Sequence, residues 1–416
     1  MNISKNKAIN CGMYLILILN IYIYLISNKQ FGNITILKYG IILIGIGYFF
    51  MFYRINKCSV KNNIGLIAIL MIIQFFFLPL SIFLIQGITE TIGYSFISLI
   101  CILFYICIAY FLKDEERFEK FVKIFYLMTL IYIIIAIVNN PPVVNIMDIK
   151  NNLFNIDGRM NREMYGFVAP NAFAILSITN ILLSFYLSIT TYKKQVFKKF
   201  FMYITIVFNI IFIVTTASRG ALISLIVFFL VFFYNKIVIK RTNKIVNYII
   251  TLGISIYIIN IISNFFSLGL NYSKLSSGRI GNWIEVIQRL NEKKSMFMGL
   301  GYVNSNTFYN SDITANLLTD NWFIHTLATQ GYLGFILGII LIVVILITIY
   351  KVEIKKYSDT NNYIKSFMML ILVYSSIENM FFNVNYILTM LYWITIFTYL
   401  FRSIDFINYK GRMKNE

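Results

Sequence analysis

Apolar blocks of about 20 residues follow one another along the chain, separated by short polar breaks. A helix of about 20 apolar residues matches the roughly 30 Å hydrocarbon core of a bilayer. Of the 416 residues, 59% are hydrophobic and only 13% are charged, whereas a soluble domain carries about 25% charged residues. The pattern predicts an all-α polytopic membrane protein and excludes a water-soluble fold.

The blocks predict about twelve transmembrane helices in a single integral membrane domain, 1–416. The predicted spans are 11–27, 35–53, 63–86, 91–112, 119–138, 166–190, 200–217, 219–235, 245–263, 321–350, 362–379 and 384–402. The apolar run 200–235 is divided because a single helix of that length would reach about 54 Å. Both of its ends are basic and belong on one side of the membrane. The run therefore forms a hairpin with Arg219 at its outer tip.

Basic residues predict the orientation of the spans. The chain has 36 Lys and Arg against 17 Asp and Glu, a net charge of +19. With both termini in the cytoplasm, 25 of these 36 cations fall on the cytoplasmic side, as the positive-inside rule requires. Topology thus accounts for the excess charge, and no nucleic-acid partner is expected.

Two predicted outer segments are long enough to hold a functional site: 139–165, and the large extracytoplasmic loop 264–320 before the tenth span. A short helix is expected at 281–290 within that loop. The sequence contains no P-loop and no G-x-G-x-x-G motif, and the single histidine, His325, makes a histidine-based metal site improbable. Chemistry is therefore expected beside the membrane, with neither metal nor cofactor.

Arginines on the outer side are the main candidates for chemistry. A guanidinium is a planar fork of donors that binds phosphate oxygens in pairs and keeps its charge. Arginines converging from separate loops would form a pyrophosphate site. The alternative is snorkelling to the headgroups, which is the interpretation for Lys29 and Lys38. Trp283 either stacks on a sugar or sits at the interface. The outer candidates are Arg159, Arg162, Asn171, Ser218, Arg219, Arg279 and Trp283.

The start of the tenth span holds a second group of candidates. Asn321 and His325 are four residues apart and share a helix face if the helix starts by residue 321. His325 is otherwise a polar group packed in a core, and Asp320 is a natural helix N-cap. A stripe of small residues farther along indicates close helix packing, and its members are Gly331, Gly334 and Gly338.

Four motifs occur in a fixed order. They are GRMNREMYGFVAPNAFA at 158–174, TTASRGA at 215–221, SGRIGNWIEVI at 277–287 followed by MGLGY, and TDNWFIHTLATQGYLG at 319–334. With these motifs the chain resembles the O-antigen and capsular polysaccharide polymerases of the Wzy type and the related O-antigen ligases. The resemblance covers 158–334 in motifs and the whole chain in span count and loop placement.

The resemblance implies a GT-C-like membrane glycosyltransferase of the bacterial cytoplasmic (inner) membrane. Its substrates would be undecaprenyl-pyrophosphate-linked repeat units, and its partner a chain-length regulator. Arg159 or Arg162, with Arg219 and Arg279, would bind the pyrophosphate. Asp320-Asn321 stands where the ligases have His-Asn, which favours a polymerase, and Asp320 or His325 would accept the proton. A ligase, or a flippase for the same lipid-linked unit, is the alternative.

Overall fold

The computed structural model describes residues 2–27, 34–53, 62–143, 162–167, 169–237, 279–302, 307–308, 317–318, 320–351 and 358–412. Their elements are α1 (Asn2–Ser27), α2 (Ile34–Phe52), α3 (Asn62–Ile72), the π-helical turn η2 (Ile73–Phe77), α4 (Leu78–Gln86), α5 (Thr89–Phe111), α6 (Glu115–Asn139), α8 (Pro170–Ile189), α9 (Val196–Thr215), α10 (Arg219–Ile237), α13 (Arg279–Glu292), β1 (Thr307–Phe308), β2 (Leu317–Leu318), α14 (Trp322–Lys351), α15 (Ser358–Ser375) and α16 (Ile387–Arg412). The described fold is helical apart from one antiparallel pair of two-residue strands.

Eight helices within these ranges are long and apolar enough to cross a membrane, which confirms a polytopic membrane protein. Two more, α2 and α16, carry shorter apolar stretches. The eleventh predicted span, 362–379, falls on α15, which ends at Ser375. The ninth, 245–263, lies outside the described residues. Twelve crossings and a GT-C fold therefore stay predictions.

The helical hairpin predicted within 200–235 is confirmed. α9 ends at Thr215 and α10 begins at Arg219. Between them Ala217 adopts a φ of 48°, and the backbone N–H of Arg219 donates to the Ala217 carbonyl at 3.1 Å. This short turn breaks the apolar run at the position that the charge pattern required.

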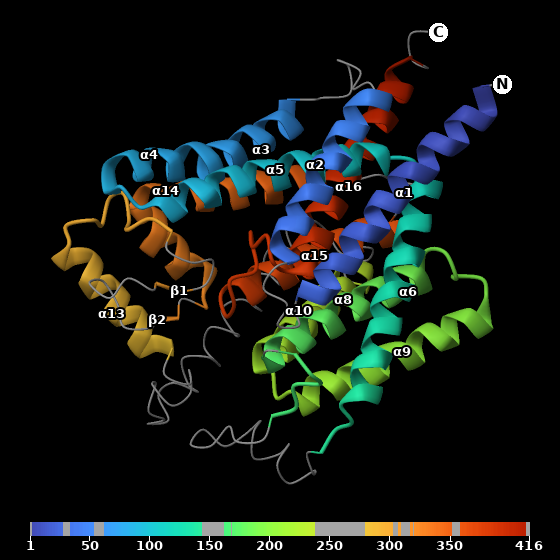
Figure 1. Ribbon diagram of the computed structural model, residues 1–416. Helices are drawn as coiled ribbons and strands as arrows, with labels where there is room; N and C mark the ends of the chain where they lie inside the picture. Colours follow the sequence, from blue (N-terminus) through green and yellow to red (C-terminus); the bar gives the residue numbers. More distant parts are fainter. Residues whose placement is uncertain are drawn as a thin grey trace.

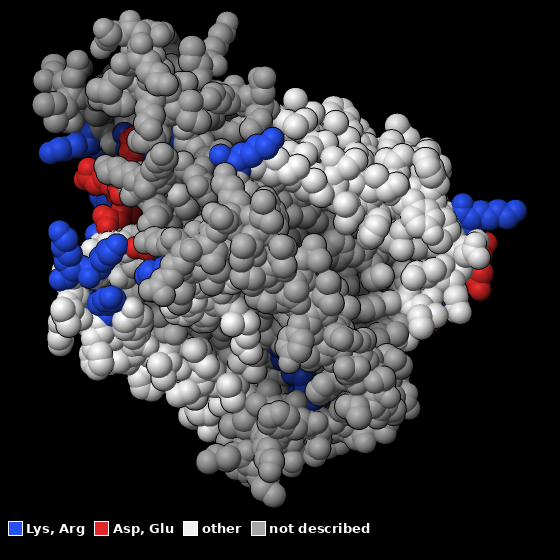
Figure 2. Space-filling view, turned by 180° about the vertical axis from the view of Figure 1, so that it is seen from behind, with Lys and Arg blue, Asp and Glu red and all other residues white. Residues whose placement is uncertain are grey.

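Both termini lie at one end of the helix bundle, and α13, β1 and β2 lie at the other, which we call the far end (Figure 1). In the face shown in Figure 2, many of the described charged side chains gather at one edge and a small group lies at the opposite edge, with a few basic side chains between them. Ion pairs tie helices together at the end with the termini: Asp359 of α15 pairs with Lys193 at 2.8 Å and with Lys236 of α10 at 3.8 Å.

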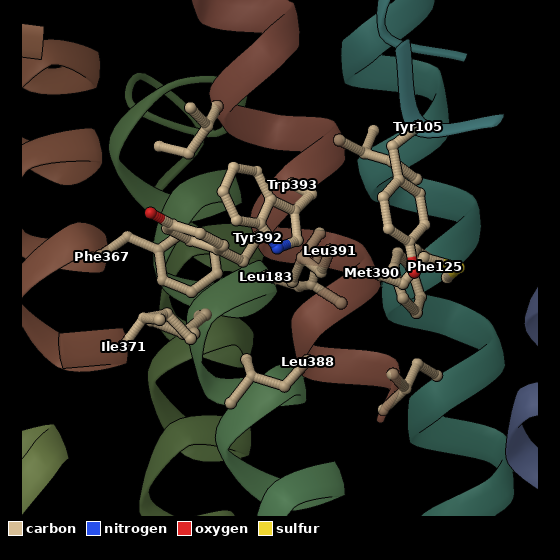
Figure 3. Packing of buried hydrophobic residues seen from close by; sticks show 14 of the residues in the cluster. Tyr105, Phe125, Leu183, Phe367, Ile371, Leu388, Met390, Leu391, Tyr392 and Trp393 are labelled. Atoms are coloured by element: carbon tan, nitrogen blue, oxygen red, sulfur yellow. The ribbon is translucent and has the colours of Figure 1, made fainter. Parts of the chain in front are cut away.

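The core centres on α8, in which every residue from Phe173 to Ile189 is buried. Aromatic side chains of α16 fill the space around it: Trp393 and Tyr392 lie near Leu183 of α8 and Phe367 of α15 (Figure 3). The Phe367 and Tyr392 rings meet edge to face at 5.5 Å, a favoured aromatic geometry. α8 is thus surrounded by protein, and its N-terminus is held in a fixed place at the far end.

The connection 376–386, which we call the α15–α16 loop, folds into the bundle. Its Val384 carbonyl accepts hydrogen bonds from the Tyr24 hydroxyl at 2.9 Å and from the Lys38 ammonium, while Phe382 stacks on Phe75 at 4.0 Å. Lys38 is only 1% exposed, so the interpretation of this residue as a snorkelling side chain is wrong: its charge meets backbone carbonyl and aromatic ring instead. Lys29 lies outside the described residues.

α14 is interrupted at Gly331, which has φ 65° and ψ −165°. Segment 296–301 uses the backbone groups that the break releases: the N–H of Leu300 donates to the Ala328 carbonyl at 2.8 Å, and the N–H of Tyr332 donates to the Met296 carbonyl at 2.9 Å. The predicted glycine stripe is therefore wrong at Gly331, because the residue breaks the helix. The close packing predicted for Gly338 is confirmed, since a Cβ there would lie 2.7 Å from the Trp322 ring.

Replacing Gly331 with alanine should destabilise the protein by on the order of 3 kcal/mol, because this φ/ψ region is open essentially to glycine alone. A Cβ would also lie 2.3 Å from the Phe297 carbonyl oxygen. Thermal unfolding in detergent checks this. The matched control is Gly47→Ala in α2, where a Cβ meets nothing within 4 Å. Equal melting temperatures for the two variants would contradict the assigned role of Gly331.

Candidate functional site

Segments from four parts of the chain meet at the α15–α16 loop at the far end. The group that we call the far-end cluster consists of Arg162, Asn171, Arg219, Asn321 and Glu378. Two of the four sequence motifs, 158–174 and 215–221, are joined here directly by side-chain hydrogen bonds. The motif at 319–334 reaches the same loop through Asn321.

Arg162 joins the segment before α8 to the α9–α10 turn. Its Nε donates to the Thr216 carbonyl at 2.8 Å, and its Nη2 donates to Asn171 Oδ1 at 2.9 Å. Asn171 follows Pro170, the first residue of α8, where a missing N–H costs nothing. The guanidinium fork thereby fixes the N-terminus of the central helix against the turn that carries Arg219.

Asn171 links this arginine to a buried acid. Its Nδ2 donates to Glu378 Oε1 at 2.6 Å, so one amide accepts from a cation and donates to a carboxylate. Glu378 is only 7% exposed, and its backbone N–H donates to the Tyr374 carbonyl at 2.7 Å. A buried carboxylate requires such polar partners because burial without them is costly.

Ser218 and Arg219 begin α10 beside the same loop. Ser218 is buried, and its carbonyl accepts the N–H of Leu222 at 3.1 Å. The turn approaches the loop closely: a Cβ on Gly220 would lie 2.7 Å from Ile377. The Arg219 side chain is half-buried. A helix N-terminus next to a guanidinium favours anions, because both present N–H donors and positive charge.

Asn321 caps α14 and binds the loop at once. Its Oδ1 accepts the backbone N–H groups of Phe323 at 2.8 Å and Ile324 at 3.2 Å, while its Nδ2 donates to the Ser376 carbonyl at 2.7 Å. The cap predicted at Asp320 is therefore wrong by one residue, because α14 begins at Trp322 and its cap is the residue directly before.

His325 lies one turn into α14, and its backbone N–H donates to the Asn321 carbonyl at 2.8 Å. The predicted shared helix face required a helix that starts by residue 321, whereas α14 begins at Trp322. Its side chain is buried and meets the Tyr302 ring edge to face at 5.6 Å. Burial raises the pKa of Tyr302, whose hydroxyl also accepts from Gln330 Nε2 at 2.6 Å. These surroundings are those of a polar group packed in a core.

Three other predicted site residues are Arg159, Arg279 and Trp283. Arg159 lies outside the described residues, and Arg279 begins α13 with its side chain outside them. Trp283 is half-buried on α13, a helix that packs on α14 through Val286 and Leu290. Across the described ranges, no group of three or more His, Cys, Asp or Glu has the arrangement of a metal site.

Glu378 is the cluster residue that sequence reasoning missed. A signal for it exists, because an ionisable residue inside a predicted span is by default a functional candidate. The span was predicted to continue to 379, whereas α15 ends at Ser375 and the acid lies in the loop that follows. Only the fold shows that this loop turns back against Asn171.

No protein-family model matches the chain, and comparison with curated proteins gave no significant match. The family resemblance therefore rests on the four motifs and on the predicted topology. The geometry adds two cations, two amides and a carboxylate held at one end of a membrane bundle. Such a set can bind an anionic headgroup and accept a proton.

Proposed function

We propose that the protein is an oligosaccharide repeat-unit polymerase, which joins undecaprenyl-pyrophosphate-linked units into O-antigen, capsular or exopolysaccharide on the outer side of the bacterial cytoplasmic membrane. The observation that carries the proposal is the hydrogen-bonded path from Arg162 through Asn171 to Glu378. Through this path a single amide side chain, that of Asn171, connects the guanidinium of Arg162 to the carboxylate of Glu378, which can act as a base. Both lie at one end of a membrane bundle, where lipid-linked substrates are accessible.

The reaction requires no nucleotide, because the donor is already activated. A hydroxyl oxygen of the incoming unit attacks the anomeric carbon of the growing chain and forms the new glycosidic bond. The bond from that carbon to the pyrophosphate oxygen breaks, and undecaprenyl pyrophosphate leaves with the electron pair. The acceptor proton passes to a general base, and we assign this role to the carboxylate of Glu378. The candidates from sequence for the same role are Asp320 and His325.

Arg219 and Arg162 stabilise the charge that develops on the departing pyrophosphate. Fixed donors directed at developing charge in a partly dry site are among the strongest contributions to catalysis. By the motif resemblance, Arg279 and either Arg159 or Arg162 are also candidates to bind the pyrophosphate. Asn171 and Asn321 attach the starts of α8 and α14 to the α15–α16 loop through their hydrogen bonds to Glu378 and to the Ser376 carbonyl.

A flippase for the same lipid-linked unit is the second candidate, and a specific feature favours it. Helices interrupted within a membrane are typical of transporters, and α14 is interrupted at Gly331. Beside it, Gln74 of the π-helical turn η2 donates to the Gly334 carbonyl at 3.3 Å. A ligase that transfers finished polymer is the third candidate, on motif resemblance alone.

Deleting the gene and sizing lipid-linked and surface glycans separates these functions. A polymerase predicts single repeat units on outward-facing lipid and no ladder of longer chains. Long chains retained on undecaprenyl pyrophosphate would assign a ligase instead. Units confined to the cytoplasmic leaflet would assign a flippase. An unchanged glycan profile would contradict all three.

A further inference from the structure

The turn that follows α13 carries two adjacent lysines and an exposed aromatic ring. Lys293 and Lys294 are exposed, and the Phe297 side chain is 64% exposed. The turn has a defined conformation: the N–H of Lys294 donates to the Asn291 carbonyl at 3.0 Å, and that of Ser295 donates to the Leu290 carbonyl at 2.9 Å. The lysines and the phenylalanine are therefore held in fixed positions.

Backbone and side-chain bonds attach this turn to two spans. The N–H of Leu333 in α14 donates to the Phe297 carbonyl at 3.2 Å, and Gln86 Nε2 of α4 donates to the Gly299 carbonyl at 3.2 Å. Both spans expose apolar side chains near these points: Leu84 is 76% exposed on α4, and Ile336 is 56% exposed on α14. Since both helices are candidate spans, Phe297 continues a membrane-facing surface.

The two exposed flanks of α13 differ in polarity, one being apolar and the other charged. Val286 and Leu290 are buried against α14. At about 100° per residue, Ile284 and Ile287 lie on one flank of that buried face, where they are 52% and 38% exposed. The opposite flank carries the Arg289–Glu285 ion pair at 2.6 Å. A helix with an exposed apolar flank, ending in lysines, is typical of one that lies in a membrane interface.

We propose that α13 and the turn 293–297 lie in the headgroup layer of the membrane at the far end, and that Lys293 and Lys294 bind phosphate groups of anionic lipids. Phe297 and the two isoleucines reach the acyl boundary, while the ammonium groups reach the phosphates, as long basic side chains do at interfaces. The small charged group at the right edge of Figure 2 protrudes from the side where Figure 1 places α13. This inference is independent of the proposed function.

Native mass spectrometry of the delipidated protein titrated with phosphatidylglycerol tests the proposal. The variant Lys293→Ser/Lys294→Ser should bind its tightest phosphatidylglycerol about tenfold more weakly than wild type, and phosphatidylcholine equally well, because two ammonium groups near lipid phosphates are lost. The matched control is Lys198→Ser/Lys199→Ser, which removes two lysines from α9 at the opposite end. It should retain the tight phosphatidylglycerol site.

Three outcomes would overturn the proposal. The first is unchanged phosphatidylglycerol affinity in the Lys293→Ser/Lys294→Ser variant, or an equal loss in the control. The second is displacement of the lipid by inorganic phosphate at matched concentration, which would assign the lysines to a soluble anion. The third is a dimer of wild type that disappears in Phe297→Ser, because the apolar face would then be covered by a second copy of the chain.

Discussion

Replacing Glu378 by glutamine should lower the rate of polymer formation by roughly 10²–10⁴-fold, the usual contribution of a general base. Glutamine keeps the size of the side chain and an amide oxygen that accepts from Asn171 Nδ2, so the hydrogen bond of 2.6 Å can persist. Only the ability to take up the acceptor proton is lost. The measurement is the polysaccharide ladder in cells that carry Glu378→Gln as their sole copy.

Two comparisons make this result specific. Glu378→Gln should accumulate in the membrane at the wild-type level and unfold at a similar temperature, because the packing of the α15–α16 loop is retained. Asp320→Asn and His325→Gln should each lower the rate less than Glu378→Gln does. A wild-type ladder in Glu378→Gln, together with a lost ladder in Asp320→Asn or His325→Gln, would transfer the role of base to that residue.

Truncation of Arg219 to alanine should reduce polymer at least about 100-fold, the loss seen when one preorganised donor to a developing anion is removed. Arg219 begins α10, so its guanidinium adds to the positive end of that helix. Arg219→Lys should be intermediate, because an ammonium keeps the charge but lacks the planar fork. Polymer ladders and protein levels in the membrane are measured for both variants.

The matched control for this loss is Arg289→Ala. Arg289 also lies on the far-end side of the protein, but it belongs to α13, where it pairs with Glu285 at 2.6 Å. Its removal should leave the ladder unchanged. Wild-type polymer in Arg219→Ala, or equal losses in Arg219→Ala and Arg289→Ala, would contradict a specific role for Arg219.

Sequence alone predicted the helices well, because apolar length and the siting of cations are strong local signals. The hairpin at 215–219 followed from two basic ends and an apolar run too long for one crossing. The structure joins the motifs 158–174 and 215–221 through Arg162 and Thr216. Such convergence was expected for arginines from separate loops, although the pattern did not indicate that the first contact would be to a backbone carbonyl.

Features that depend on the path of the backbone could not be predicted from the sequence. Gly331 fits a helical stripe by spacing, yet its φ of 65° ends one helix and begins another. Lys38 reads as an interfacial cation, whereas the loop that buries it comes from residues more than 340 positions away. Glu378 was missed for the same reason. Its partner Asn171 is 207 residues distant in the sequence, and a local sequence pattern cannot predict a contact between such distant residues.

The most direct test of the central claim is reconstitution. The purified protein, in liposomes containing undecaprenyl-pyrophosphate-linked repeat units, a metal chelator and no nucleotide, should form chains of two or more units. It should release one undecaprenyl pyrophosphate for each new bond, and Glu378→Gln in the same liposomes should release far less. Repeat units that stay single in wild-type liposomes, or that only move between leaflets, would contradict the assignment of this bundle as a polymerase.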